Sequence, residues 1–112
     1  MVINDVELEF DLLDVETFEK YDNFKKGLAD MEDKVKDMST VESMKYQCTA
    51  IFNAFNELFG EGTDVKIFGN RTNLGKCMDA VFALVEEEEK QANAMSNRYK
   101  KYTNARVTRA KK

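Results

Sequence analysis

The sequence contains no histidine and no proline, and only two of its 112 residues are cysteine. Without histidine, the chain lacks the commonest general base and the commonest metal ligand. The two cysteines, Cys48 and Cys77, are too few for a disulfide framework or a zinc site, and both fall on apolar faces of predicted helices. Because proline is the strongest helix breaker, its absence favours long helices. We therefore expect a mainly helical domain that uses no metal and no cofactor.

Catalytic motifs and long apolar segments are also missing. No segment approaches the roughly 20 apolar residues that a membrane-spanning helix needs, and the acidic N-terminus does not resemble a signal peptide. The glycine-containing segments 60–63 and 69–72 lack the spacing and the lysine of a nucleotide-binding loop. The four consecutive glutamates 86–89 are interpreted as a solvated helix surface. The chain is therefore predicted to be cytoplasmic, to have no membrane partner and not to be an enzyme.

The charges are divided unequally along the chain. All 21 acidic residues lie at or before Glu89, whereas residues 98–112 contain seven of the 17 Lys and Arg residues and no acid. Residues 1–97 thus carry 10 − 21 = −11, and the last fifteen residues carry +7. This pattern predicts an acidic helical domain over residues 1–97, with an N-terminal β-hairpin in residues 1–12, and a basic C-terminal arm over residues 98–112. A basic arm of this kind is suited to binding an anionic or protein partner.

Two signals predict the N-terminal hairpin. Apolar and acidic residues alternate from Val6 to Leu12, which is the pattern of a half-buried strand. Asn4 and Asp5 can form the turn that pairs this strand with residues 1–3. Such a two-stranded ribbon is marginally stable alone, so it is expected to pack on the helices.

Three principal helices are predicted from apolar residues that recur at steps of three and four. The first follows an N-cap at Asp14 and extends over residues 15–38. The second begins at Ser39, which has capping-box spacing with Glu42, and ends at Gly60. We expect this second helix to form the centre of the core. Its predicted buried residues are Met44, Cys48, Ile51, Phe52, Phe55, Leu58 and Phe59.

The third helix is predicted to be too long for the domain that it joins. A short apolar turn at residues 65–68 precedes it, and either Asn70 or Thr72 can cap it. If the helix is continuous over residues 72–104, it extends about 50 Å. Its distal half is therefore expected to project, with a thin apolar stripe along it. The predicted core residues of its first half are Leu74, Cys77, Met78, Val81, Phe82 and Val85, and the distal stripe consists of Ala92, Met95, Tyr99 and Tyr102.

Three segments together resemble a known family. They are LDVETFEKY at residues 13–21, FNELFGEGT at residues 55–63 and IFGNRTNL at residues 67–74. In these segments, and in its predicted order of elements, the chain resembles small prophage proteins of Gram-positive (Firmicutes) siphophages that are encoded among tail genes and regarded as tail assembly chaperone-like. The resemblance covers most of the chain but not its last twenty residues. It implies a non-enzymatic role in tail morphogenesis, in which the protein coats the helical tape measure protein until tail tube subunits polymerise around it.

The partners implied by this resemblance are the tape measure protein and the tail tube subunit. The implied location is the cytoplasm of a bacterial host. The sequence leaves open whether the protein forms a homo-oligomer. Two alternatives also stay open. The first is a small nucleic-acid-associated regulator that uses the basic arm, in which tyrosines accompany the cations. The second is a structural subunit of the virion, such as a connector or tail component. The residues predicted to contact a partner are exposed aromatic, apolar and cationic positions of the distal helix: Met95, Arg98, Tyr99, Lys101, Tyr102, Arg106 and Arg109.

Overall fold

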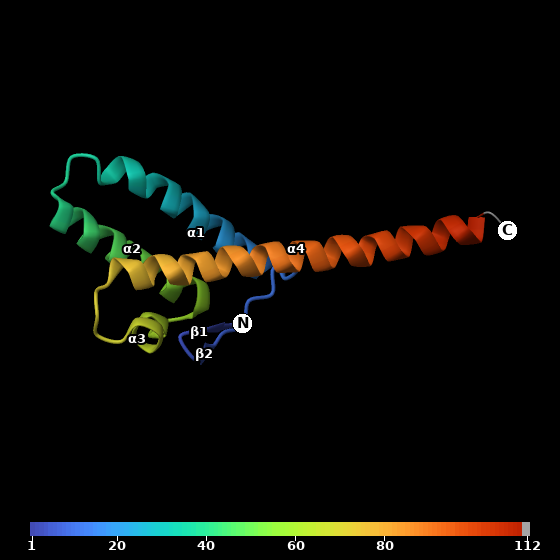
Figure 1. The fold of residues 1–112 in the computed structure, drawn as a ribbon, viewed down its shortest axis with the longest axis horizontal. Coiled ribbons are helices and arrows are strands. Elements are labelled where there is room, and N and C mark those ends of the chain that lie inside the picture. Colours follow the sequence, from blue (N-terminus) through green and yellow to red (C-terminus); the bar gives the residue numbers. More distant parts are fainter. Residues whose placement is uncertain (111–112) are drawn as a thin grey trace.

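The protein is a helical domain with a small N-terminal β-hairpin and one long helix that projects from it (Figure 1). The computed structural model describes residues 1–110, with side chains described through Thr103. The mainly helical fold, the hairpin and the long C-terminal helix agree with the sequence prediction. The elements are β1 (Val2–Ile3), β2 (Val6–Glu7), α1 (Val15–Lys34), α2 (Thr40–Phe59), α3 (Thr63–Phe68) and α4 (Leu74–Ala110).

The hairpin turns at the predicted residues but is shorter than predicted. Asn4 and Asp5 both have positive φ, 48° and 65°, which is the requirement of a type I′ hairpin turn. Strand β2 ends at Glu7, whereas the alternating pattern predicted a strand up to Leu12. The alternation of burial nevertheless continues, with Leu8 and Phe10 buried and the acids Glu7, Glu9 and Asp11 exposed. Beyond Leu8 the extended chain packs on helices instead of pairing with a strand, because burial of alternate side chains does not require a hydrogen-bonded neighbour.

Helix α1 begins as predicted and ends earlier than predicted. The Asp14 carboxylate accepts a hydrogen bond from the Thr17 N–H at 3.2 Å. The helix ends at Lys34, four residues before the predicted end. Ser39 explains the difference, because it is the N-cap of α2 and has extended backbone angles (φ −64°, ψ 163°) that a helical residue does not have. The chain must therefore leave α1 and turn before it reaches Ser39.

Helix α2 is the centre of the core, as predicted. It packs against α1, α3 and α4. Phe55 is fully buried, and its ring lies 5.7 Å from that of Phe24, 5.9 Å from that of Phe59 and 5.6 Å from that of Phe68, measured between centroids. The prediction that Met44 is buried was wrong, because this residue lies in the first turns of α2, beyond the elements that cover the rest of the helix, and is 43% exposed.

The cap and the buried face of α4 both differ from the prediction. Asn73, rather than Asn70 or Thr72, caps the helix, since its side-chain oxygen accepts the Lys76 N–H at 3.0 Å. Among the strongly buried positions are Cys77, Ala80 and Leu84, which lie on one line along the helix. The buried face of α4 is narrow because α4 packs mainly against α2, which covers only one side of it. Three residues predicted to be buried lie to one side of that line and are exposed, namely Met78, Phe82 and Val85.

The distal half of α4 projects beyond the rest of the molecule. Every described side chain from Ala92 to Thr103 is exposed. The molecule measures 67 × 30 × 22 Å, and its long axis follows this helix (Figure 1). An α-helix of 37 residues is about 55 Å long, which is more than a domain of this size can cover. The exposed part of α4 is therefore a surface available to other molecules.

Replacing Gly27 with alanine is expected to stabilise the protein. Gly27 lies inside α1, and a Cβ at this position would meet no atom within 4 Å. Alanine is favoured over glycine in a helix by about 1 kcal/mol, so the free energy of unfolding should rise by about 0.5–1 kcal/mol in chemical denaturation. Gly75→Ala is the matched control, because a Cβ there would lie 3.2 Å from the Asn73 side-chain oxygen that caps α4. Equal gains from both substitutions would contradict this account.

Candidate functional site

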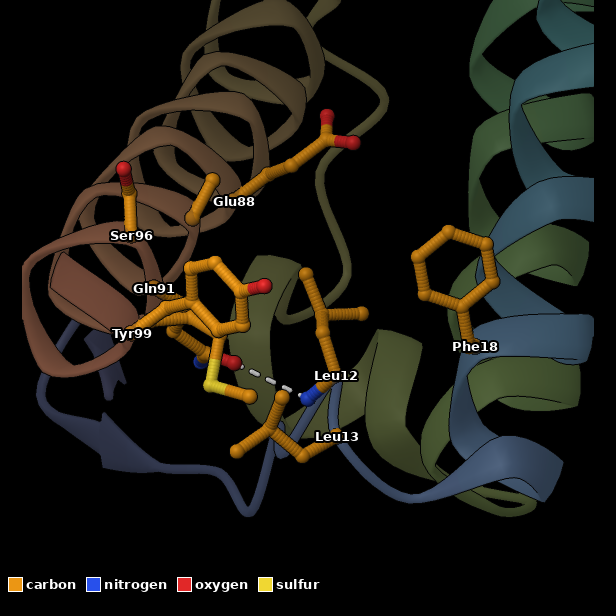
Figure 2. A pocket seen from close by; sticks show the side chains of 9 residues that line it. Leu12, Leu13, Phe18, Glu88, Gln91, Ser96 and Tyr99 are labelled. Atoms are coloured by element: carbon orange, nitrogen blue, oxygen red, sulfur yellow. Dashed lines mark hydrogen bonds between the residues drawn. The ribbon is translucent and has the colours of Figure 1, made fainter. Parts of the chain in front are cut away.

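An open apolar groove lies where α4 leaves the body of the protein (Figure 2). One wall comes from the segment between the hairpin and α1 and from the first turn of α1, and the other wall is α4 itself. The groove has a volume of about 470 Å³. We call it the α4 groove. It is lined by Leu12, Leu13, Phe18, Glu88, Gln91, Ala92, Met95, Ser96 and Tyr99.

The apolar side chains of the α4 groove are unusually exposed. Leu13 is 56% exposed and Phe18 45% on one wall, and Met95 and Tyr99 on the other wall are 44% and 67% exposed. Single exposed apolar residues are common on protein surfaces, but a contiguous group of them marks an interaction site. Leu12 and Ala92 lie in the same hollow. The α4 groove therefore has the composition of a surface that binds apolar side chains.

Gln91 fixes the distance between the two walls. Its side-chain oxygen accepts a hydrogen bond from the Leu12 N–H at 2.9 Å (Figure 2), and its Nε2 donates to the Phe10 carbonyl. The same Nε2 also donates to Glu87 Oε1 at 3.2 Å. The side-chain amide of Gln91 thus forms the hydrogen bonds with the Leu12 N–H and the Phe10 carbonyl that a paired β-strand would otherwise form. This pairing holds Leu12 and Leu13 beside α4, so the wall is built before any partner binds.

Glu88 joins α4 to α1 at the inner end of the groove. The Tyr21 hydroxyl donates a hydrogen bond to Glu88 Oε1 at 2.9 Å, and Lys25 Nζ lies 3.1 Å from Oε2. Lys25 also lies over the Tyr21 ring, 4.8 Å from its centroid. Burial, together with the hydrogen bond to Glu88 and its negative charge, raises the pKa of the Tyr21 phenol above its ordinary value. The interpretation of glutamates 86–89 as solvated surface was therefore wrong for Glu87 and Glu88, which are half-buried and hydrogen-bonded.

The groove has the chemistry of a binding surface. Gln91 and Glu88 are occupied by hydrogen bonds that hold the fold together. Cys48 and Cys77 are buried in the core, outside the groove. Burial and the neighbouring Cys48 raise the pKa of the Cys77 thiol to about 12, so it is protonated at neutral pH and is a poor nucleophile. Within residues 1–110, the acidic and cysteine side chains form no group of three that could hold a metal ion.

Residues 4–112 match the model of a family of unknown function, DUF6673. The chain belongs to the DUF6673 family. No curated protein and no solved structure matches it. All nine residues that line the α4 groove lie inside the DUF6673 match, as does the basic arm. None of the helices in the described part of this DUF6673 protein is long and apolar enough to cross a membrane.

Five of the seven predicted contact residues of this DUF6673 member fall in three places. Met95 and Tyr99 line the α4 groove. Arg98 lines a smaller adjoining hollow of about 160 Å³ together with Asp11 and Leu13. Lys101 and Tyr102 are exposed farther along the same helix. The side chains of the remaining two predicted residues, Arg106 and Arg109, lie outside those that the structure describes.

The sequence prediction missed the wall opposite α4. Leu12 was assigned to a strand, and Phe18 falls on the predicted apolar face of the first helix, residues 15–38; neither was predicted to contact a partner, whereas both line the groove. One signal was present in the sequence. Leu13 follows Leu12 directly, and it interrupts the alternation of apolar and acidic residues just before the Asp14 cap. A second leucine at this position cannot point to the same side as the first, so one of the two had to lie outside the regular pattern.

Proposed function

We propose that this protein is a non-enzymatic assembly chaperone that binds an amphipathic helix of another protein in the α4 groove. The observation that carries the proposal is the contiguous group of exposed apolar side chains on two preformed walls. A helical partner would place its apolar face between Phe18 on one wall and Met95 and Tyr99 on the other, as in other helix-in-groove complexes. The projecting part of α4 would extend the contact along the partner.

The partner that we propose is the tape measure protein of a siphophage tail, with assembly of the tail as the process. Support comes from the resemblance of residues 13–21, 55–63 and 67–74 to tail assembly chaperone-like prophage proteins. A long helical protein with exposed apolar stripes needs to be covered until its permanent partner arrives. The acidic body, with −11 over residues 1–97, would keep such a complex soluble by repulsion between copies.

A second candidate function is nucleic-acid binding through the basic arm. The observation that favours it is the exposure of Tyr99, Lys100 and Lys101 on the projecting helix, where cations and an aromatic ring occur together. Glu86 and Glu89 are exposed on the same helix and would repel phosphates. We therefore rank this function second to protein binding.

Co-expression of the full chain with the tape measure protein of a Firmicutes siphophage tests the proposal. The expected result is that the tape measure protein stays soluble and elutes together with the chain. Met95→Asp places a charge in the groove and should weaken this complex at least about tenfold, because it desolvates an unpaired carboxylate at the contact. Val41→Asp is the matched control, since Val41 is 61% exposed and lies outside the groove. This control should bind as the unmodified chain does.

Three outcomes would overturn the proposal. The first is that the two proteins do not elute together, and the second is that Met95→Asp and Val41→Asp bind equally well. The third is that the protein is a stoichiometric component of purified virions, which would make it a structural subunit. Tight RNA or DNA binding that disappears on deletion of residues 98–112 would favour the second candidate function instead.

A further inference from the structure

The first half of α4 carries an exposed apolar surface outside the α4 groove. Met78, Phe82 and Val85 follow one another at steps of four and three, and they are 37%, 63% and 38% exposed. They lie within about 60° of one another around the helix axis, well away from the buried line through Leu84. We call this surface the proximal face of α4. On the side of α1 it adjoins a hollow of about 340 Å³, which is lined by Leu28, Met31, Glu32, Val35, Gln47, Met78 and Val81.

The proximal face has an acidic border. Residues 77–89 contain five acidic residues and no Lys or Arg. Asp79, Glu86 and Glu89 are exposed on this stretch, and Glu32 is exposed on the α1 side of the hollow. In the part of the chain that the structure describes, none of these four carboxylates forms an ion pair. The proximal face is thus matched to a surface that is both apolar and cationic.

The projecting end of α4, residues 98–110, has the complementary composition. Tyr99 and Tyr102 are 67% and 59% exposed, and they lie three positions apart on one side of the helix. Lys100 and Lys101 are exposed beside them. The basic arm to which they belong carries +7 and no acid. The projecting end is therefore an aromatic surface with the opposite charge to that of the proximal face.

The two surfaces cannot meet within one molecule. Both lie on α4, which is one continuous helix from Leu74 to Ala110 and holds them apart. From Phe82 to Tyr99 the helix rises about 26 Å. In Figure 1 the projecting end points away from the rest of the molecule. The opposite charges can therefore come together only between different copies of the chain.

The two surfaces also face different directions. Tyr99 follows Phe82, and Tyr102 follows Val85, by 17 positions (99 − 82 and 102 − 85), which turns each pair by about 100° around the helix axis. Two copies related by a two-fold axis along α4 therefore cannot pair both surfaces at once. Each copy instead uses its projecting end on one neighbour and its proximal face on another, which is a heterologous contact.

We propose that this protein associates with itself head to tail, with the projecting end of α4 from one copy bound on the proximal face of another. The two tyrosines and the apolar side chains of the proximal face supply the contact, and the cations of the arm lie beside the acidic border. Because this contact is not closed by a two-fold axis, it joins copies into chains or rings. The proposal goes beyond the chaperone function and requires no phage partner. Tyr99 is shared with the α4 groove, whereas Phe82 and Val85 lie outside it.

Sedimentation velocity of the purified full chain, over a range of concentrations at low ionic strength and without any partner, tests the association. The unmodified chain is expected to form species larger than a dimer, which increase with concentration and decrease when salt is added. Two variants each remove one surface. Phe82→Lys places a cation on the proximal face, and Lys100→Glu combined with Lys101→Glu reverses charge on the projecting end. Each variant alone should associate at least about tenfold more weakly.

An equal mixture of the two variants gives the decisive measurement. The double variant keeps its proximal face and Phe82→Lys keeps its projecting end, so one intact pair of surfaces remains. The mixture should form a one-to-one dimer and nothing larger. Val65→Lys is the matched control, since Val65 is 59% exposed on α3, outside both surfaces, and it should associate as the unmodified chain does. Circular dichroism checks that helix content is unchanged, which is expected because all the substituted side chains are exposed.

The proposal is overturned if the unmodified chain is a monomer or stops at a dimer, or if Phe82→Lys associates as well as Val65→Lys. It is also overturned if the double variant associates as well as the unmodified chain, or if the mixture of variants gives no dimer. These measurements contain no tape measure protein, so such a failure would leave the proposed chaperone function standing. Phe82→Lys leaves the α4 groove intact and should still bind the tape measure protein. Failure of co-elution with the tape measure protein would in turn leave the head-to-tail contact standing.

Discussion

Replacing Phe55 with alanine is expected to lower the free energy of unfolding by about 3–5 kcal/mol. The Phe55 side chain is fully buried at the centre of α2, and the rings of Phe24 and Phe68 meet it edge to face. The substitution removes this ring and leaves a cavity between α1, α2 and α3. These helices cannot move close enough to fill it. Since small domains are stable by only about 5–15 kcal/mol, the loss should be visible as a large shift of the midpoint in chemical denaturation.

Phe82→Ala is the matched control for this measurement. Phe82 is also a helical phenylalanine, but it is 63% exposed on α4. Its replacement should change the free energy of unfolding by no more than about 0.5 kcal/mol, as is usual at the surface. A loss at Phe82 comparable to that at Phe55 would mean that the exposed face of α4 is packed, and it would contradict the narrow buried face described above.

The second large effect is expected at Glu88. Its replacement by alanine should lower the free energy of unfolding by about 1–3 kcal/mol, because the buried Tyr21 hydroxyl would lose its hydrogen-bond acceptor. Lys25 would lose its ion-pair partner as well, although this pair is partly exposed and contributes less. Chemical denaturation of the purified variant gives the value.

Tyr21→Phe identifies the source of the Glu88 effect. This substitution removes the donor together with the hydrogen bond, so it should cost only about 1 kcal/mol. In the Tyr21→Phe background, Glu88→Ala should then cost clearly less than it does alone, because no hydroxyl is left without an acceptor. Strictly additive losses in this double-mutant cycle would show that the hydrogen bond between Tyr21 and Glu88 does not carry the effect.

Local signals in the sequence predicted most of the fold. Asp14 and Ser39 cap helices where their side chains could be expected to do so, and Asn4 and Asp5 turn the hairpin. The predictions that failed concern features that are set by tertiary packing between elements. An apolar stripe shows that Phe82 could be buried, but only the position of α2 decides which part of that stripe is covered. The end of β2 and the end of α1 likewise depend on neighbouring elements rather than on the residues within them.

One wall of the candidate site could be predicted and the other could not. The stripe that includes Met95 and Tyr99 continues beyond the last residue that a small domain can bury, so its exposure follows from helix length alone. The other wall includes Leu12 and Leu13, which lie beside α4 where Gln91 forms hydrogen bonds with the extended segment. This contact joins residues that are about eighty positions apart in the chain, and no local pattern indicates it.

The uninterrupted course of α4 has a mechanical consequence. A flexible tether would let a cationic tail sample many directions, whereas a continuous helix acts as a stiff spacer with a fixed rise per residue. The cations at Arg98, Lys100 and Lys101 are thereby held at a set distance and bearing from Leu84, which is fully buried. A torque applied to the helix at these cations is transmitted along α4 to the hydrophobic core. A partner bound there would therefore rotate together with the whole domain.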